Sequence, residues 1–186
     1  MLETELKAML TKELYNAVDK MYPWNSKKLQ KNFYYLDKNG TLLKNRSVFR
    51  IRQKDGGFKI QVKIHKNSDS PLQICEELEY TADCAPGQIN AEKAEEYTGL
   101  KTGELYRAGF NETLRNSFMW NETTEICLDK TTYFDVTDYE IEIEYTGELP
   151  QELIDELDKA GVKFDKSSVG KYSRFLKKLS EMSRNE

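Results

Sequence analysis

The chain has 186 residues, the size of one domain, and its 28 basic and 32 acidic side chains leave a formal net charge of −4. This balance argues against a nucleic-acid binder that works through a broadly basic surface, and 8 Phe, 11 Tyr and 2 Trp argue against disorder. No apolar run approaches the roughly 18 residues of a membrane helix, and no secretory signal opens the sequence. Three cysteines in no disulfide or CxxC pattern favour reduced thiols. We therefore expect a single cytoplasmic domain over residues 1–186, with no nucleic-acid or membrane partner.

The N-terminal part of the chain reads as a strand, a helix and a hairpin. Polar and apolar residues alternate over residues 3–9, which predicts a strand, and Thr11 is placed to cap a helix that runs to about residue 21. Asp37-Lys-Asn-Gly40 is a strong turn signal. It predicts a hairpin of strands at residues 33–36 and 42–43.

A second hairpin follows, with strands at residues 48–53 and 58–64 around Asp55-Gly-Gly57. Another strand is predicted at residues 72–81. Residues 88–97 then read as a helix, which Gly99 ends.

The C-terminal half repeats the mixture of strands and helices. Strands are predicted at residues 114–120, 125–128 and 139–145. Pro150 opens a helix that runs to residue 160, and an amphipathic helix covers residues 169–182. Short strands with a few amphipathic helices indicate an α+β fold.

On each predicted strand the charged side chains share one face and the apolar side chains share the other. Most of the charges are sorted by sign, as in Glu3 with Glu5, Arg50 with Arg52, Lys59 with Lys63, Glu77 with Glu79, and Glu140, Glu142 and Glu144, and Lys7 shares the face of Glu3 and Glu5. A sheet with one solvated face accounts for each strand singly. Like charges side by side repel, however, so such runs favour binding to something of opposite sign. The helices need an apolar sheet face to pack on, and each of these strands offers only one. A closed sheet with helices outside and charges inside would give the helices that face and the charges a ligand of opposite sign.

This interior chemistry suggests a ligand. Carboxylate oxygens suit Mg²⁺ and Mn²⁺, and Arg and Lys suit phosphate oxygens. Together they point to a metal-bound polyphosphate, whereas internal salt bridges alone would be costly in so small a domain.

His65 is the only histidine, so a histidine-based triad or zinc site would rest entirely on it.

The chain resembles the CYTH superfamily, the triphosphate tunnel metalloenzymes. The resemblance starts at Glu3-Thr-Glu-Leu-Lys7, the family's ExExK signature, and spans almost the whole chain. Further matching segments are Tyr34-Tyr-Leu-Asp37, Phe49-Arg-Ile-Arg52, Ile60-Gln-Val-Lys63, Glu77-Leu-Glu79, Leu128-Asp129, Glu140-Ile-Glu-Ile-Glu144, and Lys171 with Arg174-Phe175.

The resemblance implies a closed eight-stranded antiparallel β-barrel, a tunnel with a charged interior and helices packed outside. It implies a divalent cation, Mg²⁺ or Mn²⁺, and a small anionic triphosphate substrate. We expect hydrolysis of inorganic tripolyphosphate to diphosphate and phosphate, by a monomer or a homodimer. The alternatives are nucleoside or thiamine triphosphate hydrolysis, adenylate cyclase activity, and a non-catalytic sensor that binds polyphosphate or nucleotide.

The resemblance also implies roles for individual residues. The expected catalytic residues are Glu5, Glu142 and Glu144. The expected phosphate-binding residues are Lys7, Arg50, Arg52, Lys63, Arg115 and Lys171. The expected metal ligands are Glu3, Glu5, Glu77, Glu79, Asp129, Glu142 and Glu144. Which of Glu140, Glu142 and Glu144 face a metal stays open at this point.

Overall fold

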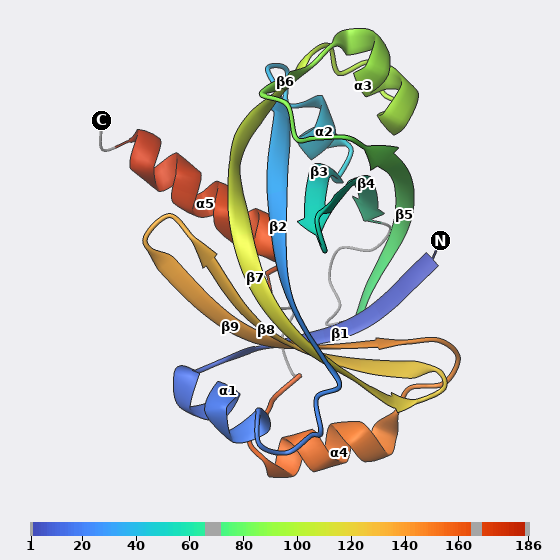
Figure 1. Cartoon of the computed structure of the whole chain (residues 1–186), viewed down its shortest axis with the longest axis vertical. Coiled ribbons are helices and arrows are strands. Elements are labelled where there is room, and N and C mark those ends of the chain that lie inside the picture. Colours follow the sequence, from blue (N-terminus) through green and yellow to red (C-terminus); the bar gives the residue numbers. More distant parts are fainter. Residues whose placement is uncertain (1, 66–71, 165–168, 185–186) are drawn as a thin grey trace.

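The computed structural model describes residues 2–65, 72–164 and 169–184 of the chain. Within these residues nine strands form one antiparallel sheet, and five helices lie on its outside (Figure 1). The strands are β1 (Leu2–Leu10), β2 (Ser26–Asp37), β3 (Ser47–Lys54), β4 (Gly57–His65), β5 (Leu72–Ala82), β6 (Gln88–Ile89), β7 (Leu105–Asn121), β8 (Thr124–Tyr133) and β9 (Val136–Tyr145). The helices are α1 (Lys12–Val18), α2 (Thr41–Lys44), α3 (Ala91–Thr98), α4 (Gln151–Lys159) and α5 (Lys171–Ser183).

The strand order makes β1 and β9 neighbours, although these two acidic strands are far apart in the sequence. The order is β2-β3-β4-β5-β1-β9-β8-β7-β6, and β2 pairs with β7 as well as with β3. The β2–β7 pairing is long, from Ser26 opposite Ser117 to Asp37 opposite Leu105. The expected α+β fold with an antiparallel sheet is confirmed. The sheet has nine described strands and not eight, because the two-residue strand β6 pairs with one end of β7.

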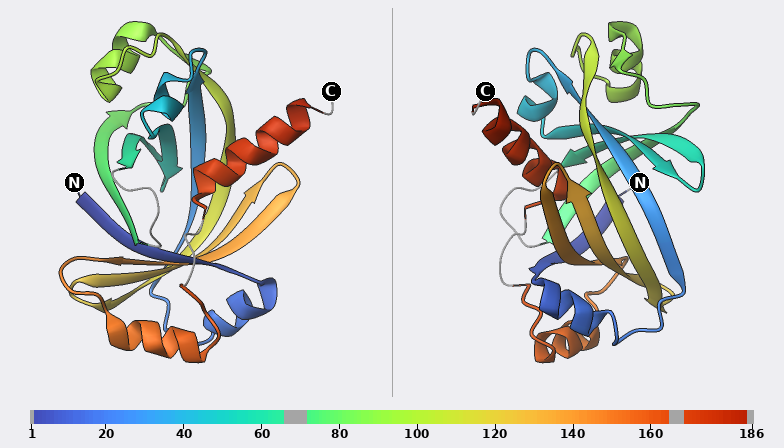
Figure 2. Two further views of the ribbon diagram at one scale, coloured as in Figure 1. Left: turned by 180° about the vertical axis from the view of Figure 1, so that it is seen from behind. Right: turned by 60° about the vertical axis from the view of Figure 1, so that its left-hand side comes forward.

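The helices cover the apolar outer face of the sheet. Helices α1 and α4 lie together against β1, β8 and β9, whereas α2 and α3 lie at the opposite end of the molecule (Figures 1 and 2). The alternation of side chains along β9 explains the core under α1 and α4. Ile141 and Ile143 are fully buried there, while the glutamates next to them face the other side of the sheet. The apolar pattern therefore faces the helices, as the sequence predicts.

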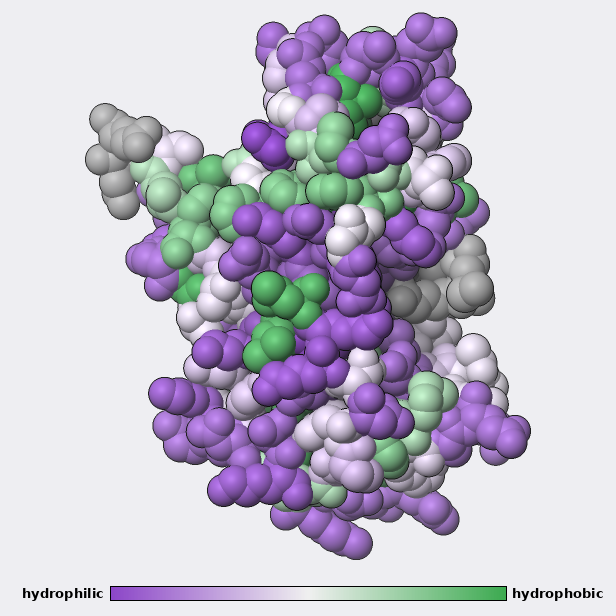
Figure 3. Space-filling view, viewed as in Figure 1, coloured by the Kyte–Doolittle hydropathy of each residue, from purple (hydrophilic) through white to green (hydrophobic). Residues whose placement is uncertain are grey.

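The face of the molecule seen in Figure 3 carries one stretch of sheet that no helix covers. It is mostly hydrophilic, with a small apolar patch over β2 and β7. Leu29 of β2 and Phe110 of β7 are among the exposed apolar residues there, at 61% and 44% exposure. Among the described residues, no helix is both long and apolar enough to span a membrane.

Local sequence explains the turns. The β3–β4 hairpin is confirmed, and both of its central residues, Asp55 and Gly56, have positive φ (52° and 80°), as a tight two-residue turn requires. The helix cap at Thr11 is confirmed too, since its Oγ1 accepts a hydrogen bond from Leu14 N at 3.2 Å.

The hairpin predicted around Asp37-Lys-Asn-Gly40 is wrong. The Asp37 carboxylate accepts hydrogen bonds from the backbone N–H groups of Thr41 and Leu42, at 2.6 and 3.0 Å. N–H groups at the start of a helix have no partner within the helix. By accepting from them, Asp37 stabilises the short helix α2, which stands where the second strand of the hairpin was predicted. Strand β2 pairs with β3 across that connection.

Helix α5 is held against the sheet by an aromatic contact that needs a glycine. Phe175 of α5 is fully buried, and its ring lies against Gly109 of β7. Gly109 has φ +153°, and a Cβ atom there would lie 2.8 Å from Phe175 Cζ. Because α5 carries Lys171, this close approach also positions a residue of the predicted site.

We expect Gly109→Ala to lower the free energy of unfolding by about 1–3 kcal/mol, the usual cost of overpacking a well-packed core. Urea denaturation of both proteins measures the difference. Gly87→Ala is the matched control, since a Cβ atom at Gly87 meets nothing within 4 Å. Equal stability of Gly109→Ala and wild type would show that α5 does not depend on this contact.

Candidate functional site

The charged face of the sheet surrounds a cavity of about 820 Å³. Its lining includes twelve of the thirteen residues that the sequence predicts for the site: Glu5, Lys7, Arg50, Arg52, Lys63, Glu77, Glu79, Arg115, Asp129, Glu142, Glu144 and Lys171. The thirteenth, Glu3, belongs to β1 by its backbone, but its side chain lies outside the described part of the structure. The structure therefore brings predicted residues from eight strands and helices into one space.

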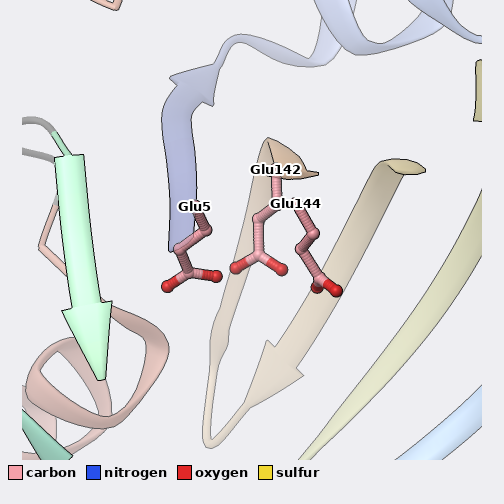
Figure 4. A group of neighbouring side chains, drawn as sticks. All are labelled: Glu5, Glu142 and Glu144. Carbon is pink, nitrogen blue, oxygen red and sulfur yellow. The ribbon is translucent and has the colours of Figure 1, made fainter. Parts of the chain in front are cut away.

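Three carboxylates meet on one wall of this cavity (Figure 4). Glu5 of β1 is paired in register with Glu144 of β9, and Glu142 is two residues away on the same face. Oxygen atoms from the three side chains lie within 4.8 Å of one another, and Glu5 and Glu142 are each only 5% exposed. Buried carboxylates this close repel, so they require cations nearby. Their oxygens are the donors that Mg²⁺ and Mn²⁺ prefer.

Lys7 and Arg115 supply positive charge to these carboxylates. Lys7 Nζ lies 2.7 Å from Glu5 Oε1 and 3.4 Å from Glu142 Oε1. Burial by itself would lower the pKa of Lys7, but Glu142 and Glu5 outweigh it and raise the pKa above its ordinary value. Arg115 contacts Glu142 as well, and its Nη1 lies 3.1 Å from Glu144 Oε1.

A second acidic group, of Asp129, Glu140 and Glu142, surrounds the ammonium group of Lys171. Lys171 Nζ lies 2.8 Å from both Asp129 Oδ2 and Glu142 Oε1, and it also contacts Glu140. Asp129 accepts two hydrogen bonds from Arg115, at 2.8 and 2.7 Å. Burial opposes the charge of Asp129, but Arg115 and Lys171 hold its pKa well below the usual range.

The three glutamates of β9 have different surroundings. Glu140 is 1% exposed, and its Oε2 accepts a hydrogen bond of 2.5 Å from Arg174 of α5. Glu142 and Glu144 line the cavity, and Glu140 does not appear in its lining. Glu140 is therefore an anchor for α5, and Glu142 and Glu144 are the two that a ligand in the cavity can reach.

The opposite wall is basic and is built from β3 and β4. Arg50 and Arg52 share one face of β3, and Lys63 lies on β4. Lys63 Nζ lies 3.1 Å from Glu77 Oε2, and Arg50 is 3.8 Å from the same side chain. Glu77 therefore belongs to this basic wall.

Glu79 is exposed and binds Lys59 at 2.8 Å and Gln61 at 2.5 Å. Neither Glu77 nor Glu79 is part of the acidic groups found among the described side chains. Both line the cavity, at a place where basic residues predominate.

Arg52 has the least compensated charge of the basic wall. No carboxylate in the described part of the chain lies within ion-pair distance of it, and its Nε donates to the side-chain oxygen of Asn32 at 2.8 Å. Burial and the nearby charges of Arg50 and Arg115 lower the pKa of Arg52 to about 9. An anion placed next to Arg52 would stabilise the charge of its guanidinium group.

The neutral polar residues of the interior were not predicted from the sequence. Asn32, Asn111 and Thr113 are buried to 2% exposure or less and lie among the charged residues. The strands predicted at 33–36 and 114–120 are too short to include Asn32 and Asn111. Extending the alternation along the full length of β2 and β7 would have placed both on the inner face.

The comparisons with known proteins identify the family of the chain. The family model described as CYTH domain matches residues 1–175 of the chain. No protein among the curated sequences matches it.

Several solved structures are similar. HpAC1 of Hippeastrum, named as a candidate adenylyl cyclase with a dominant triphosphatase activity, has a TM-score of 0.75 and 23% identity over 94% of this chain and 95% of its own. A candidate adenylate cyclase of Bacillus halodurans has a TM-score of 0.69 and 22% identity over 93% and 96%. The mimivirus capping enzyme triphosphatase has a TM-score of 0.57 and 13% identity over 86% and 87%. At these levels of sequence identity, the similarity of the structures establishes a shared fold and nothing further.

We expect Glu142→Gln to weaken Mn²⁺ binding by at least about tenfold, because loss of even an outer-sphere partner costs that much at a metal site. Titration of the metal-free protein, followed by electron paramagnetic resonance of free Mn²⁺, measures the affinity. Glu77→Gln is the matched control, since Glu77 lines the same cavity outside the acidic groups. A larger loss in Glu77→Gln than in Glu142→Gln would move the metal site to the basic wall.

Proposed function

Because a CYTH domain covers residues 1–175, the chain belongs to the CYTH family, and we propose that it is a divalent-metal-dependent triphosphatase that hydrolyses inorganic tripolyphosphate to diphosphate and phosphate. The observation that carries the proposal is the division of one cavity into an acidic and a basic wall. Glu5, Glu142 and Glu144 lie on β1 and β9, and Arg50 and Arg52 lie on β3. A chain of phosphates bound to a metal ion complements both walls.

We propose that the cavity is a closed eight-stranded tunnel within one domain. Support comes from the pairing of β2 with β7, since β2 is the first strand in the pairing order and β7 is the eighth. Support also comes from the orientation of the sheet, whose apolar face packs on helices and whose charged face lines the cavity. A closed sheet removes polar backbone edges and encloses a ligand.

The carboxylates of Glu5, Glu142 and Glu144 would hold Mg²⁺ or Mn²⁺, with Glu3 as a further candidate next to them on β1. Three close carboxylates with hard oxygen donors fit such an ion better than they fit zinc, which prefers nitrogen and sulfur ligands. When bound, the ion neutralises phosphate oxygens and lowers the pKa of bound water.

The basic residues would hold the phosphates. Arg50, Arg52 and Lys63 reach them from the basic wall and stabilise the charge that builds up as the terminal phosphoryl group is transferred. Lys7, Arg115 and Lys171 contact carboxylates of the acidic wall and line the cavity, so they would reach the phosphates from that side. There they orient the chain of phosphates for in-line attack by water.

A glutamate of the acidic wall would orient the attacking water. Glu144 is suited to this role, because it is more exposed than Glu5 and Glu142 and belongs to the same group. No side-chain nucleophile is required, and this agrees with a sequence that has a single histidine.

The cavity lining favours an inorganic substrate. Of its aromatic residues, Tyr34 is only 1% exposed and packs against Tyr172, with ring centroids 5.1 Å apart. A ring occupied in this way is a poor platform for a nucleobase or for thiamine. The names of HpAC1 and the Bacillus halodurans protein favour nucleotide chemistry as the second candidate function.

A substrate panel separates these functions. Phosphate release is measured from tripolyphosphate, ATP and thiamine triphosphate, with Mg²⁺, with Mn²⁺ and with a chelator. The proposal expects the highest kcat/KM for tripolyphosphate and no release with the chelator. Preference for ATP, or formation of cyclic AMP, supports nucleotide chemistry, and binding without release in every case supports a sensor.

We expect Glu5→Gln to lower tripolyphosphate turnover at saturating Mg²⁺ by at least about a hundredfold, because it removes a charged ligand without changing the shape of the side chain. Circular dichroism and thermal melting check that the variant folds. Glu112→Gln, on the outer side of β7, is the matched control and should keep wild-type turnover. Wild-type turnover in Glu5→Gln would overturn the assignment of this wall to the metal.

A further inference from the structure

A chain of hydrogen bonds through uncharged side chains connects Arg52 to the interior of the sheet. Arg52 Nε donates to Asn32 Oδ1 at 2.8 Å, Asn32 Nδ2 donates to Asn111 Oδ1 at 2.9 Å, and Asn111 Nδ2 donates to the Tyr34 hydroxyl at 3.0 Å. Asn32, Asn111 and Tyr34 are 1%, 0% and 1% exposed. Because arginine can only donate, it fixes the orientation of the first amide, which in turn fixes the second.

The far end of this chain is rigid. The Tyr34 ring packs against Tyr172 and Phe175 of α5, with centroids 5.1 and 5.0 Å away. Burial raises the pKa of Tyr34, although Arg50 and Arg52 act in the opposite direction. The hydroxyl therefore stays neutral, and no member of the chain beyond Arg52 carries charge.

The cations of the cavity differ in the kind of anchor that holds them. Lys7, Arg115 and Lys171 are held by carboxylates. Arg50 and Arg52 are both held through Nε by a side-chain amide oxygen, of Gln61 at 2.9 Å and of Asn32 at 2.8 Å, and Arg50 also lies 3.8 Å from Glu77 Oε1. A carboxylate anchor cancels much of a cation's charge, whereas an amide anchor fixes its direction and leaves the charge in place.

Arg52 shows this effect most clearly. Its two terminal nitrogens make no hydrogen bond to any described residue, and it lines the cavity. Its hydrogen bond to Asn32 uses Nε, so among the described residues nothing occupies the edge of the guanidinium group that binds an anion through its two terminal nitrogens.

We propose that Asn32 and Asn111 are positioning residues, which orient the Arg52 guanidinium toward a phosphate group of the substrate while leaving its positive charge uncompensated. The proposal rests on the proposed function for the identity of the anion, since tripolyphosphate is the ligand that the cavity is expected to hold. The two amides do not touch the substrate and act only through Arg52. A purely structural role, the satisfaction of buried polar groups, is the competing explanation.

Two substitutions at Asn32 separate these explanations. Asn32→Leu removes the anchor at nearly constant volume, so Arg52 keeps its charge but loses its fixed direction. Asn32→Asp keeps the shape and adds a carboxylate, which forms an ion pair with Arg52 and cancels its charge. A structural role predicts that binding falls only as far as stability falls. The positioning role predicts that Asn32→Asp weakens binding while its melting temperature stays at or above that of Asn32→Leu.

The experiment is calorimetric titration of tripolyphosphate into the wild type, Asn32→Leu, Asn32→Asp, Arg52→Ala and the Arg52→Ala double variants, all in EDTA so that no turnover occurs. We expect each Asn32 variant to bind at least about tenfold more weakly than the wild type. In the Arg52→Ala background we expect Asn32→Leu to cost less than twofold more, because its effect passes through Arg52.

Thr131→Val, at a buried residue outside the cavity lining, is the matched control. It breaks the buried hydrogen bond between Thr113 and Thr131, 3.0 Å long, on the same inner face, and it should leave tripolyphosphate affinity within about twofold of the wild type.

Three results would overturn the proposal. They are wild-type affinity in Asn32→Asp, additive losses in the Arg52→Ala background, and no metal-independent binding by the wild type. The proposed function fails separately, when tripolyphosphate binds with this mutational pattern but no phosphate is released with Mg²⁺ or Mn²⁺.

Discussion

The structure depends on one constraint, the neutralisation of charges that the sheet turns inward. Alternation along each strand gives the helices an apolar surface, and the same alternation places Glu5, Glu142 and Asp129 in the interior. Ionised carboxylates are stable there only when cations lie against them, which Lys7, Arg115 and Lys171 do. Well-packed apolar residues commonly stabilise a protein as much as buried ion pairs or more. Stability alone therefore does not explain the charged interior, whereas the proposed ligand binding does.

The two walls meet this constraint differently. On the acidic wall, cations and carboxylates are in direct contact, so a divalent ion bound there would compete with Lys7 and Arg115 for the same oxygens. On the basic wall, amide oxygens of Asn32 and Gln61 hold Arg52 and Arg50 through Nε, and Arg50 also lies 3.8 Å from Glu77. On the proposed function, the acidic wall would exchange one kind of cation for another, whereas the basic wall would receive an anion. A phosphate chain with its metal ion matches both.

Much of this arrangement was predictable from the sequence, because a period of two residues is visible without knowledge of the fold. Arg50 and Arg52, or Glu142 and Glu144, share a face wherever their strand lies. The resemblance to a family then placed these strands around one cavity. The pairing partners, however, depend on contacts between distant segments, such as β1 with β9 and β2 with β7.

The errors arose where short-range signals compete. Asp37-Lys-Asn-Gly40 suits a hairpin turn, but Asp37 is equally suited to accept from the first N–H groups of a helix, and the chain adopts the helix. Asn32 and Asn111 carry no charge and lie beyond the predicted ends of their strands. Their importance depends on what they touch, and the sequence alone does not show that. The different surroundings of Glu140 likewise depend on Arg174, which is distant in the chain and reaches it only because α5 packs on the sheet.

Helix α5 connects the packing of the fold to the chemistry of the cavity. Its first turns carry Lys171, which lies among the carboxylates, and Phe175, which lies against Gly109. Since a helix rises about 1.5 Å and turns about 100° per residue, a shift of one position would remove Lys171 from its pocket. Tyr34 packs on the same helix and ends the hydrogen-bonded chain from Arg52, so the docking of α5 sets the geometry of both walls at once. A glycine with no chemical role of its own is thereby a determinant of the site.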